Sequence, residues 1–120
     1  MAIKLFDSEL RVMELIWQKG AIRASKIAEI LGDEIGWSKT TTYTVIKKCL
    51  DKGAIKRENP HFVCTALIDK SKVQLTETTE HIDKFYNGSA SMLFASLVQN
   101  KKLTKNEINE LKDLVSKLEE

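Results

Sequence analysis

Apolar residues near the start of the chain recur at the interval that places them on one face of a helix. These residues are Leu10, Met13, Ile16 and Trp17. Asp7 stands before them, and its carboxylate can cap the free amides at a helix start, while Gly20 supplies a stop after them. The pattern therefore predicts an amphipathic helix between Asp7 and Gly20.

A second helix is expected after a brief strand at residues 21–23. It begins at residue 24 or 25 and ends near Gly32. Its inward residues are Ile27, Ala28, Ile30 and Leu31. Residues 33–37 are expected to form a turn, because Gly36 permits backbone angles that other residues avoid.

The third predicted helix carries the most information about function. Ser38 is a good N-cap residue, and the helix can continue to about Lys52 before Gly53 ends it. Its inward face is an unbroken stripe of Thr42, Val45, Ile46, Cys49 and Leu50. Its outward face carries Thr40, Tyr43, Thr44, Lys47, Lys48 and Asp51. Threonine is a mediocre helix former, so helix propensity does not explain this outward face.

Two strands at residues 54–58 and 61–67 are expected next, with a turn at Asn59-Pro60 between them. Three helices followed by a hairpin within about 70 residues is the layout of a winged helix-turn-helix. We therefore predict a mainly α fold with a small β wing, in which residues 1–70 form a winged helix-turn-helix domain.

Residues 71–120 are predicted to be helical and to form a dimerisation domain. Ser71 is expected to cap a helix that runs to about Tyr86, and Ser89 is expected to cap a short apolar helix. Thr104 with Glu107 forms the capping box of the last helix. These helices have more apolar surface than they can bury against each other, which favours pairing with a second copy. The alternative is a monomer whose helices fold back on the winged domain. The residues expected to make the dimer are Leu75, Ile82, Phe85, Leu93, Phe94, Leu97, Ile108, Leu111, Val115 and Leu118.

The distribution of charge is more informative than the net charge of +2. Residues 39–57 contain six basic side chains and one acidic side chain, whereas residues 71–120 contain seven basic and eight acidic ones. A basic block beside a nearly neutral helical half is typical of a nucleic-acid surface joined to an assembly surface. On charge alone, a solvated basic helix face is the alternative.

The third helix has the chemistry that a helix in the major groove needs. Threonine hydroxyls and methyls can meet phosphates or thymine methyls, and Tyr43 offers a phenol in the half of the helix that contacts bases. The helix N-terminus favours a phosphate, and the basic side chains can position the backbone of the DNA without reading its sequence. The residues expected to contact double-stranded DNA are Ser38, Lys39, Thr40, Thr41, Tyr43, Thr44, Lys47, Lys48, Lys56 and Arg57.

The sequence offers no site for catalysis, a metal or a cofactor. No nucleophile, base and orienting residue form a set, and there is no glycine-rich phosphate loop, so we expect no catalytic residues and no enzyme. His61 and His81 are isolated, and Cys49 and Cys64 have neither zinc spacing nor a disulfide framework. Two further residues, Trp17 and Trp37, are expected to pack against the core.

The sequence also predicts the compartment. No apolar run approaches the roughly 20 residues that cross a bilayer, and residues 1–7 lack the long apolar segment of a signal peptide. We therefore expect a cytoplasmic protein without direct membrane binding.

Four segments resemble the penicillinase-repressor family of the BlaI, MecI and CopY type. They are SELRVMELIW at 8–17, WSKTTTYTVI at 37–46, KGAI at 52–55 and LTKNEINEL at 103–111. The resemblance implies a winged-helix dimer that represses resistance or metal-homeostasis genes from an inverted-repeat operator. It also implies that DNA contacts fall at Thr40, Thr41, Tyr43 and Thr44, and that a membrane sensor-protease pathway is a candidate partner.

The chain departs from the family's pattern at three places. Position 43 is arginine in the best-known beta-lactam repressors, so Tyr43 implies a different or altered operator. Those repressors are cut at an Asn-Phe bond, where this chain has Ser96-Leu97, which argues against cleavage there. The copper-responsive branch ends in Cys-x-Cys pairs, whereas this chain ends in KLEE, which argues against copper release by that route.

Two other functions stay open at this point. One is a winged helix used only for protein contacts, against which the basic block argues. The other is a repressor of the same fold that senses a metal or an oxidant through Cys49 and Cys64, of which Cys64 is expected to be the better exposed. The sequence names neither the operator nor the inducing signal.

Overall fold

The computed structural model describes residues 3–119 of the 120-residue chain. Met1, Ala2 and Glu120, which the predicted domain ranges 1–70 and 71–120 include, lie outside the described residues. The chain divides into two units, residues 1–76 and 77–120. The assignment of DNA binding to the first domain and of dimerisation to the second stays a prediction.

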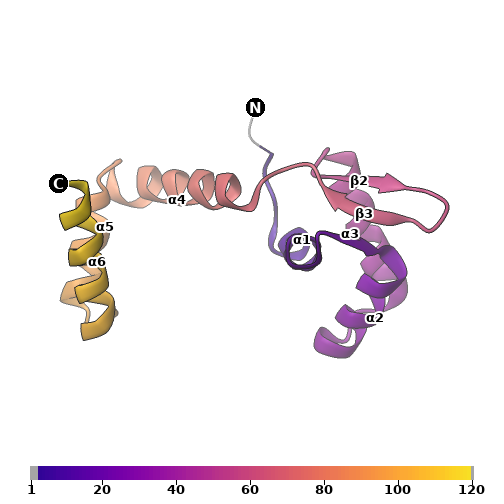
Figure 1. Cartoon of the computed structure of the whole chain (residues 1–120), viewed down its shortest axis with the longest axis horizontal. Helices are drawn as coiled ribbons and strands as arrows, with labels where there is room; N and C mark the ends of the chain where they lie inside the picture. The colour runs from indigo at the N-terminus through magenta and orange to yellow at the C-terminus, as the bar shows by residue number, and fades with distance from the viewer. Residues whose placement is uncertain (1–2, 120) are drawn as a thin grey trace. The chain divides into compact units, whose positions relative to one another are not determined.

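Three helices and a small sheet build the first unit (Figure 1). Their bounds are α1 Asp7–Lys19, β1 Ala21–Arg23, α2 Ala24–Ile35, α3 Lys39–Asp51, β2 Ile55–Glu58 and β3 Val63–Ala66. β3 lies in the middle of the sheet and pairs antiparallel with both β1 and β2. α3 packs against both α1 and α2. This is the predicted winged helix-turn-helix, with the β2–β3 hairpin as its wing.

The core lies between these helices and the sheet, and the predicted inward faces supply it. Met13 and Ile16 of α1, Ile27 of α2 and Ile46 of α3 are fully buried. The predicted stripe of α3 is confirmed, with Thr42, Val45, Ile46 and Cys49 buried and Leu50 half-buried. Trp17 and Trp37 are half-buried and pack against this core, as expected.

Two helix ends differ from the sequence prediction. Asp7 does not cap α1, because it lies in the first turn of the helix and Phe6 holds the N-cap position. The capping interaction comes from Glu9, whose carboxylate accepts a hydrogen bond from the Phe6 N–H at 2.8 Å. α2 does not end near Gly32 but runs to Ile35, and Gly36 ends it with a left-handed φ of 72°.

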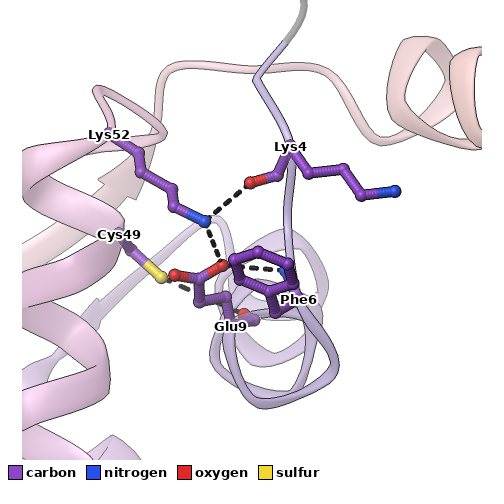
Figure 2. Close-up of polar contacts among 5 residues, drawn as sticks. All are labelled: Lys4, Phe6, Glu9, Cys49 and Lys52. Carbon is purple, nitrogen blue, oxygen red and sulfur yellow. Dashed lines mark hydrogen bonds and ion pairs between the residues drawn. The ribbon is translucent and has the colours of Figure 1, made fainter.

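A buried ion pair fastens the end of α3 to the start of α1 (Figure 2). Glu9 is 1% exposed, and its Oε1 lies 2.5 Å from the Lys52 ammonium. The same ammonium donates to the Lys4 carbonyl at 2.7 Å and lies 4.3 Å from the centre of the Phe6 ring. The cation thus ties the N-terminal segment, α1 and the C-terminal end of α3 together.

The segment before α4 is anchored on α1 within the first unit. The Trp17 Nε1–H donates to the Ile68 carbonyl at 3.0 Å, although these residues are 51 positions apart. The Lys70 ammonium lies 2.6 Å from the Glu14 carboxylate. The first residues of α4 are therefore held by contacts with α1 within the first unit.

The remaining helices are α4 Lys70–Tyr86, α5 Ala90–Gln99 and α6 Lys105–Leu118. Ser89 and Thr104 cap α5 and α6 as predicted, and Glu107 completes the capping box of α6. Ser71 is not an N-cap, because α4 already begins at Lys70. None of the three helices has a buried residue. The large apolar side chains that they expose include Leu75, Phe85, Met92, Phe94, Val98, Leu114, Val115 and Leu118.

α5 and α6 share a hollow of about 570 Å³. It is lined by Phe94 and Val98 from α5, by Leu103 before α6, and by Ile108, Leu111 and Val115 among the residues of α6. In the part of the chain that the structure describes, no helix combines the length and the apolar character needed to cross a membrane.

Candidate DNA-binding surface

The N-terminal half of α3 is built from hydroxyl side chains that hold the helix itself. The Ser38 hydroxyl accepts from the Thr41 N–H at 3.1 Å and donates to the Thr41 Oγ1 at 3.0 Å, so both residues form the cap. Thr42 is buried and donates to the Ser38 carbonyl at 3.2 Å. Thr44 donates its hydroxyl proton to the Thr40 carbonyl at 2.9 Å. The Thr44 proton is therefore committed, and its methyl and oxygen lone pairs remain for a ligand.

Five of the predicted DNA-binding residues line one shallow depression of about 640 Å³ on α3. We call this depression the α3 face, and its residues are Lys39, Thr40, Tyr43, Thr44 and Lys47. It presents two ammonium groups, two threonines and one phenol on a helix surface. This combination offers cations for phosphates together with short side chains and an aromatic edge for bases.

The two lysines of the α3 face are only weakly held. The Lys47 ammonium is 4.0 Å from the Asp51 carboxylate, and both side chains are largely exposed, at 78% and 67%. Lys39 lies 5.9 Å from the centre of the Tyr43 ring. An exposed pair at this distance contributes little to stability, so both ammonium groups can turn toward a phosphate at small cost.

Lys48 lies at a different edge of α3. It does not line the α3 face, and its charge helps to lower the pKa of the Glu9 carboxyl. The structure thus places Lys48 toward the Glu9 side of the helix, apart from the depression. Its predicted DNA contact stays a prediction.

The wing separates the two basic residues that the sequence grouped together. Adjacent residues of a strand point to opposite faces, so Lys56 and Arg57 cannot share one face of β2. Lys56 pairs with Glu58, two residues further along the strand, at 3.0 Å. Arg57 lies opposite Cys64 in the strand register, and its guanidinium carbon is 3.7 Å from the centre of the Phe62 ring.

Phe62 is a residue of this surface that the sequence analysis missed. Its ring meets the Tyr43 ring edge to face, with the ring centres 5.9 Å apart and the planes at 77°. It therefore contacts both the α3 face and the wing cation Arg57. The available signal was a lone aromatic beside the predicted Asn59-Pro60 turn, but the register of the hairpin is needed to place it against α3.

The two cysteines are buried inside the first unit and are not exposed to solvent. The expectation that Cys64 is the better exposed of the two is wrong, because both side chains are 0% exposed. Burial raises the pKa of Cys49 to about 12 and that of Cys64 to about 11. Both thiols therefore stay protonated near neutral pH, which makes them poor nucleophiles and poor metal ligands. No group of three or more metal-ligating side chains occurs within residues 3–119.

A comparison with known proteins bears on this surface. The family model of the penicillinase repressor matches residues 5–117. The penicillinase repressor of Bacillus licheniformis is 31% identical over 110 residues, which cover 90% of this chain and 86% of that protein. The methicillin resistance regulatory protein MecI of Staphylococcus aureus strain N315 is 29% identical over 116 residues, covering 95% of this chain and 94% of that one.

Two solved structures resemble part of this chain. The DNA-binding domain of the repressor BlaI is 30% identical with a TM-score of 0.55, over 59% of this chain and 89% of that one. Monomeric BlaI of Bacillus licheniformis, in complex with the blaP half-operator, is 33% identical with a TM-score of 0.52, over 58% of this chain and 89% of that one.

Proposed function

The chain belongs to the penicillinase repressor family and is a DNA-binding transcriptional repressor, and from this premise we propose that it binds an inverted-repeat operator as a homodimer. In this proposal α3 enters the major groove and the wing contacts the adjacent backbone. The protein acts by binding, without catalysis and without a cofactor. It acts in the cytoplasm, where bacterial operators are reached.

The observation that carries the proposed contact surface is the composition of the α3 face. Two lysines, two threonines and Tyr43 line one depression on the recognition helix of the winged fold. The related BlaI structure, which was solved on a half-operator, supports DNA as the ligand of this surface. The predicted contacts at Ser38 and Thr41 belong to this proposal as well: the Thr41 hydroxyl accepts from Ser38 in the cap and keeps its own proton for a phosphate.

The homodimer is supported by the apolar side chains of α4, α5 and α6. Leu75 is 68% exposed and Leu118 is 86% exposed, and none of these helices has a buried residue. Burying one such side chain contributes roughly 1.5–3 kcal/mol, so covering several of them stabilises an assembly strongly. A second copy covers them and also brings two α3 helices to the two half-sites of a palindrome.

We further propose that the regulated genes serve beta-lactam resistance or a related stress response, in line with the names of the relatives. Release through a sensor-protease pathway by cleavage at Ser96-Leu97 is disfavoured, because these residues differ from the Asn-Phe bond of the beta-lactam repressors. Both residues also lie inside the helix α5. A direct thiol switch is disfavoured by the raised pKa values of Cys49 and Cys64.

A comparison of two substitutions at Thr44 tests the α3 face. Thr44→Ala removes the methyl and the hydroxyl, whereas Thr44→Val keeps the branched shape and removes only the hydroxyl, whose proton is committed to the Thr40 carbonyl. We expect Thr44→Ala to weaken operator binding by ~1–3 kcal/mol and Thr44→Val to weaken it less. Fluorescence anisotropy with the operator duplex selected by the wild-type protein measures both.

A salt titration of the same binding reaction tests the role of the lysines. The logarithm of the affinity should fall linearly with the logarithm of the salt concentration, because phosphate contacts release counterions. Lys47→Ala should reduce this slope by about 1. Equal binding by wild type, Thr44→Ala and Lys47→Ala would place the DNA on another surface.

A further inference from the structure

Three side chains, from α3, from β2 and from the turn before β3, form a continuous series of contacts that we call the stack. Tyr43 of α3 contacts the ring of Phe62 edge to face, and the guanidinium carbon of Arg57 in β2 lies over the same ring, 3.7 Å from its centre. The Arg57 Nε–H also donates to the Asn59 side-chain carbonyl at 3.0 Å. The guanidinium is therefore held from two directions, by the ring and by the side chain of the turn.

The backbone of Phe62 is held in an unusual conformation. Its φ is 50°, in the left-handed region that a bulky aromatic residue rarely adopts. Its carbonyl accepts from the Ala24 N–H at 2.9 Å, which ties the start of β3 to the start of α2. Strained residues of this kind persist where the surrounding structure holds them, and they concentrate at functional sites.

The stack joins two parts of the surface that read different features of DNA. Tyr43 lines the α3 face, in the half of the helix that contacts base edges in a winged helix-turn-helix. Arg57 lies on the wing, and an arginine stacked on a ring has its donor edge free for a phosphate or a narrow groove. A shift of either side chain changes the support of the other through Phe62.

We propose that Phe62 is a positioning residue for operator recognition, which couples Tyr43 on α3 to Arg57 on the wing so that both contact DNA as one unit. The inference rests on the proposed function, because it requires α3 in the groove. The inference adds that the preference of α3 for particular bases depends on Arg57 of the wing. Phe62 acts through these two side chains and does not itself contact a base. Of the two basic residues of β2, only Arg57 contacts the Phe62 ring. Lys56 lies on the other face of the strand, where it pairs with Glu58.

A double-mutant cycle on the full-length protein tests the coupling. The affinities of wild type, Tyr43→Ala, Arg57→Ala and the double variant are measured on the selected operator duplex, and the cycle is repeated with Phe62→Leu. We expect each single change to weaken binding ~10-fold. The fold-loss of affinity in the double variant should be smaller than the product of the two single fold-losses by a factor of at least ~3, because either change alone already disrupts the stack.

Phe62 variants show whether the ring carries this coupling. In the Phe62→Leu protein the two effects should multiply, whereas Phe62→Tyr, which keeps a ring of the same size, should retain the coupling. Lys56→Ala paired with Tyr43→Ala is the matched control and should show no coupling. If Phe62→Leu fails to fold, Phe62→Met, which also removes the ring and keeps an apolar side chain, takes its place, and loss of the coupling is expected there as well.

The outcomes separate this inference from the function on which it rests. Multiplying effects in the wild-type background, or an unchanged coupling in Phe62→Leu, would overturn the role of Phe62. Wild-type affinity in both Tyr43→Ala and Arg57→Ala would instead contradict the proposed α3 and wing surface. Selection of no DNA sequence by the wild-type protein would contradict the operator itself.

Discussion

At the scale of single residues, the ion pair between the buried Glu9 carboxylate and Lys52 is the interaction that local sequence patterns predict least well. Burial alone raises the pKa of this carboxyl, but the hydrogen bonds from Lys52 and from the Phe6 N–H outweigh burial and lower it below its ordinary value. Glu9 therefore stays ionised in the fold. Glu9 lies in the first turn of α1, whereas its partner Lys52 is 43 residues away, beyond the reach of a local pattern.

Glu9→Gln should destabilise the protein by ~2–4 kcal/mol near neutral pH, because the Lys52 ammonium loses its buried counter-charge. A pKa that is lowered by folding contributes stability above the unfolded value, about 4.3 for glutamate, and this contribution is lost as the pH falls through the folded value. Urea unfolding should thus show a weaker acid dependence in Glu9→Gln than in wild type. Glu29→Gln, in an exposed pair with Lys26, should change stability by less than about 1 kcal/mol. An acid dependence identical to that of wild type would contradict the account of Glu9.

The buried thiols give a second prediction at this scale. Cys49 and Cys64 have pKa values raised to about 12 and about 11, so the thiolate that attacks a disulfide reagent is scarce in the folded protein near neutral pH. A chromogenic disulfide reagent should label both thiols slowly in the native state and rapidly in urea. Rapid stoichiometric labelling of the native protein would reopen a thiol-based sensor.

At the scale of elements, the sequence predicted best where the signal is local. Ser38, Ser89 and Thr104 were predicted as N-caps, and each accepts from a backbone N–H within its own first turn. The end of α2 was misjudged because Gly32 and Gly36 carry the same local signal. Only the fold decides between them, since Gly36 has a positive φ and Gly32 stays helical. Phe62 was missed for a related reason, because its partner Tyr43 belongs to another element.

The anchor between α1 and the segment before α4 can be tested with two substitutions. Trp17→Phe removes the indole N–H and leaves the Ile68 carbonyl without that donor, which should cost ~1–3 kcal/mol of unfolding free energy. Lys70→Met breaks an ion pair whose side chains are 42% and 43% exposed, and it should cost less than about 1 kcal/mol. Chemical denaturation ranks the two. A larger loss in Lys70→Met would show that the ion pair, and not the indole, holds this segment.

At the scale of the whole molecule, the apolar side chains that the three C-terminal helices expose are what favours the proposed dimer. The sequence predicted these helices and their amphipathic pattern. A local pattern does not show which helix faces of two copies pack against each other. Position 115 offers a direct test, because Val115 is 54% exposed in a single copy. A charge there should be tolerated by a monomer and disfavoured in a dimer seam.

Val115→Asp should therefore raise the dissociation constant of the dimer by ~10-fold or more, because an unpaired carboxylate would have to be buried. Asn109→Asp adds the same charge at an exposed position of α6 and should leave the dimer intact. Sedimentation equilibrium measures both. A wild-type protein that stays monomeric at tens of micromolar would contradict the dimer.

The central claim, a dimer that reads a palindrome through α3, is tested most directly by selection from a pool of randomised DNA duplexes. The wild-type protein is equilibrated with the pool at moderate salt, and the retained duplexes are sequenced. We expect an inverted repeat whose half-sites are centred about one helical turn apart, roughly 10 base pairs, or a multiple of that distance. Retention without any shared sequence, or a single half-site without its repeat, would contradict it.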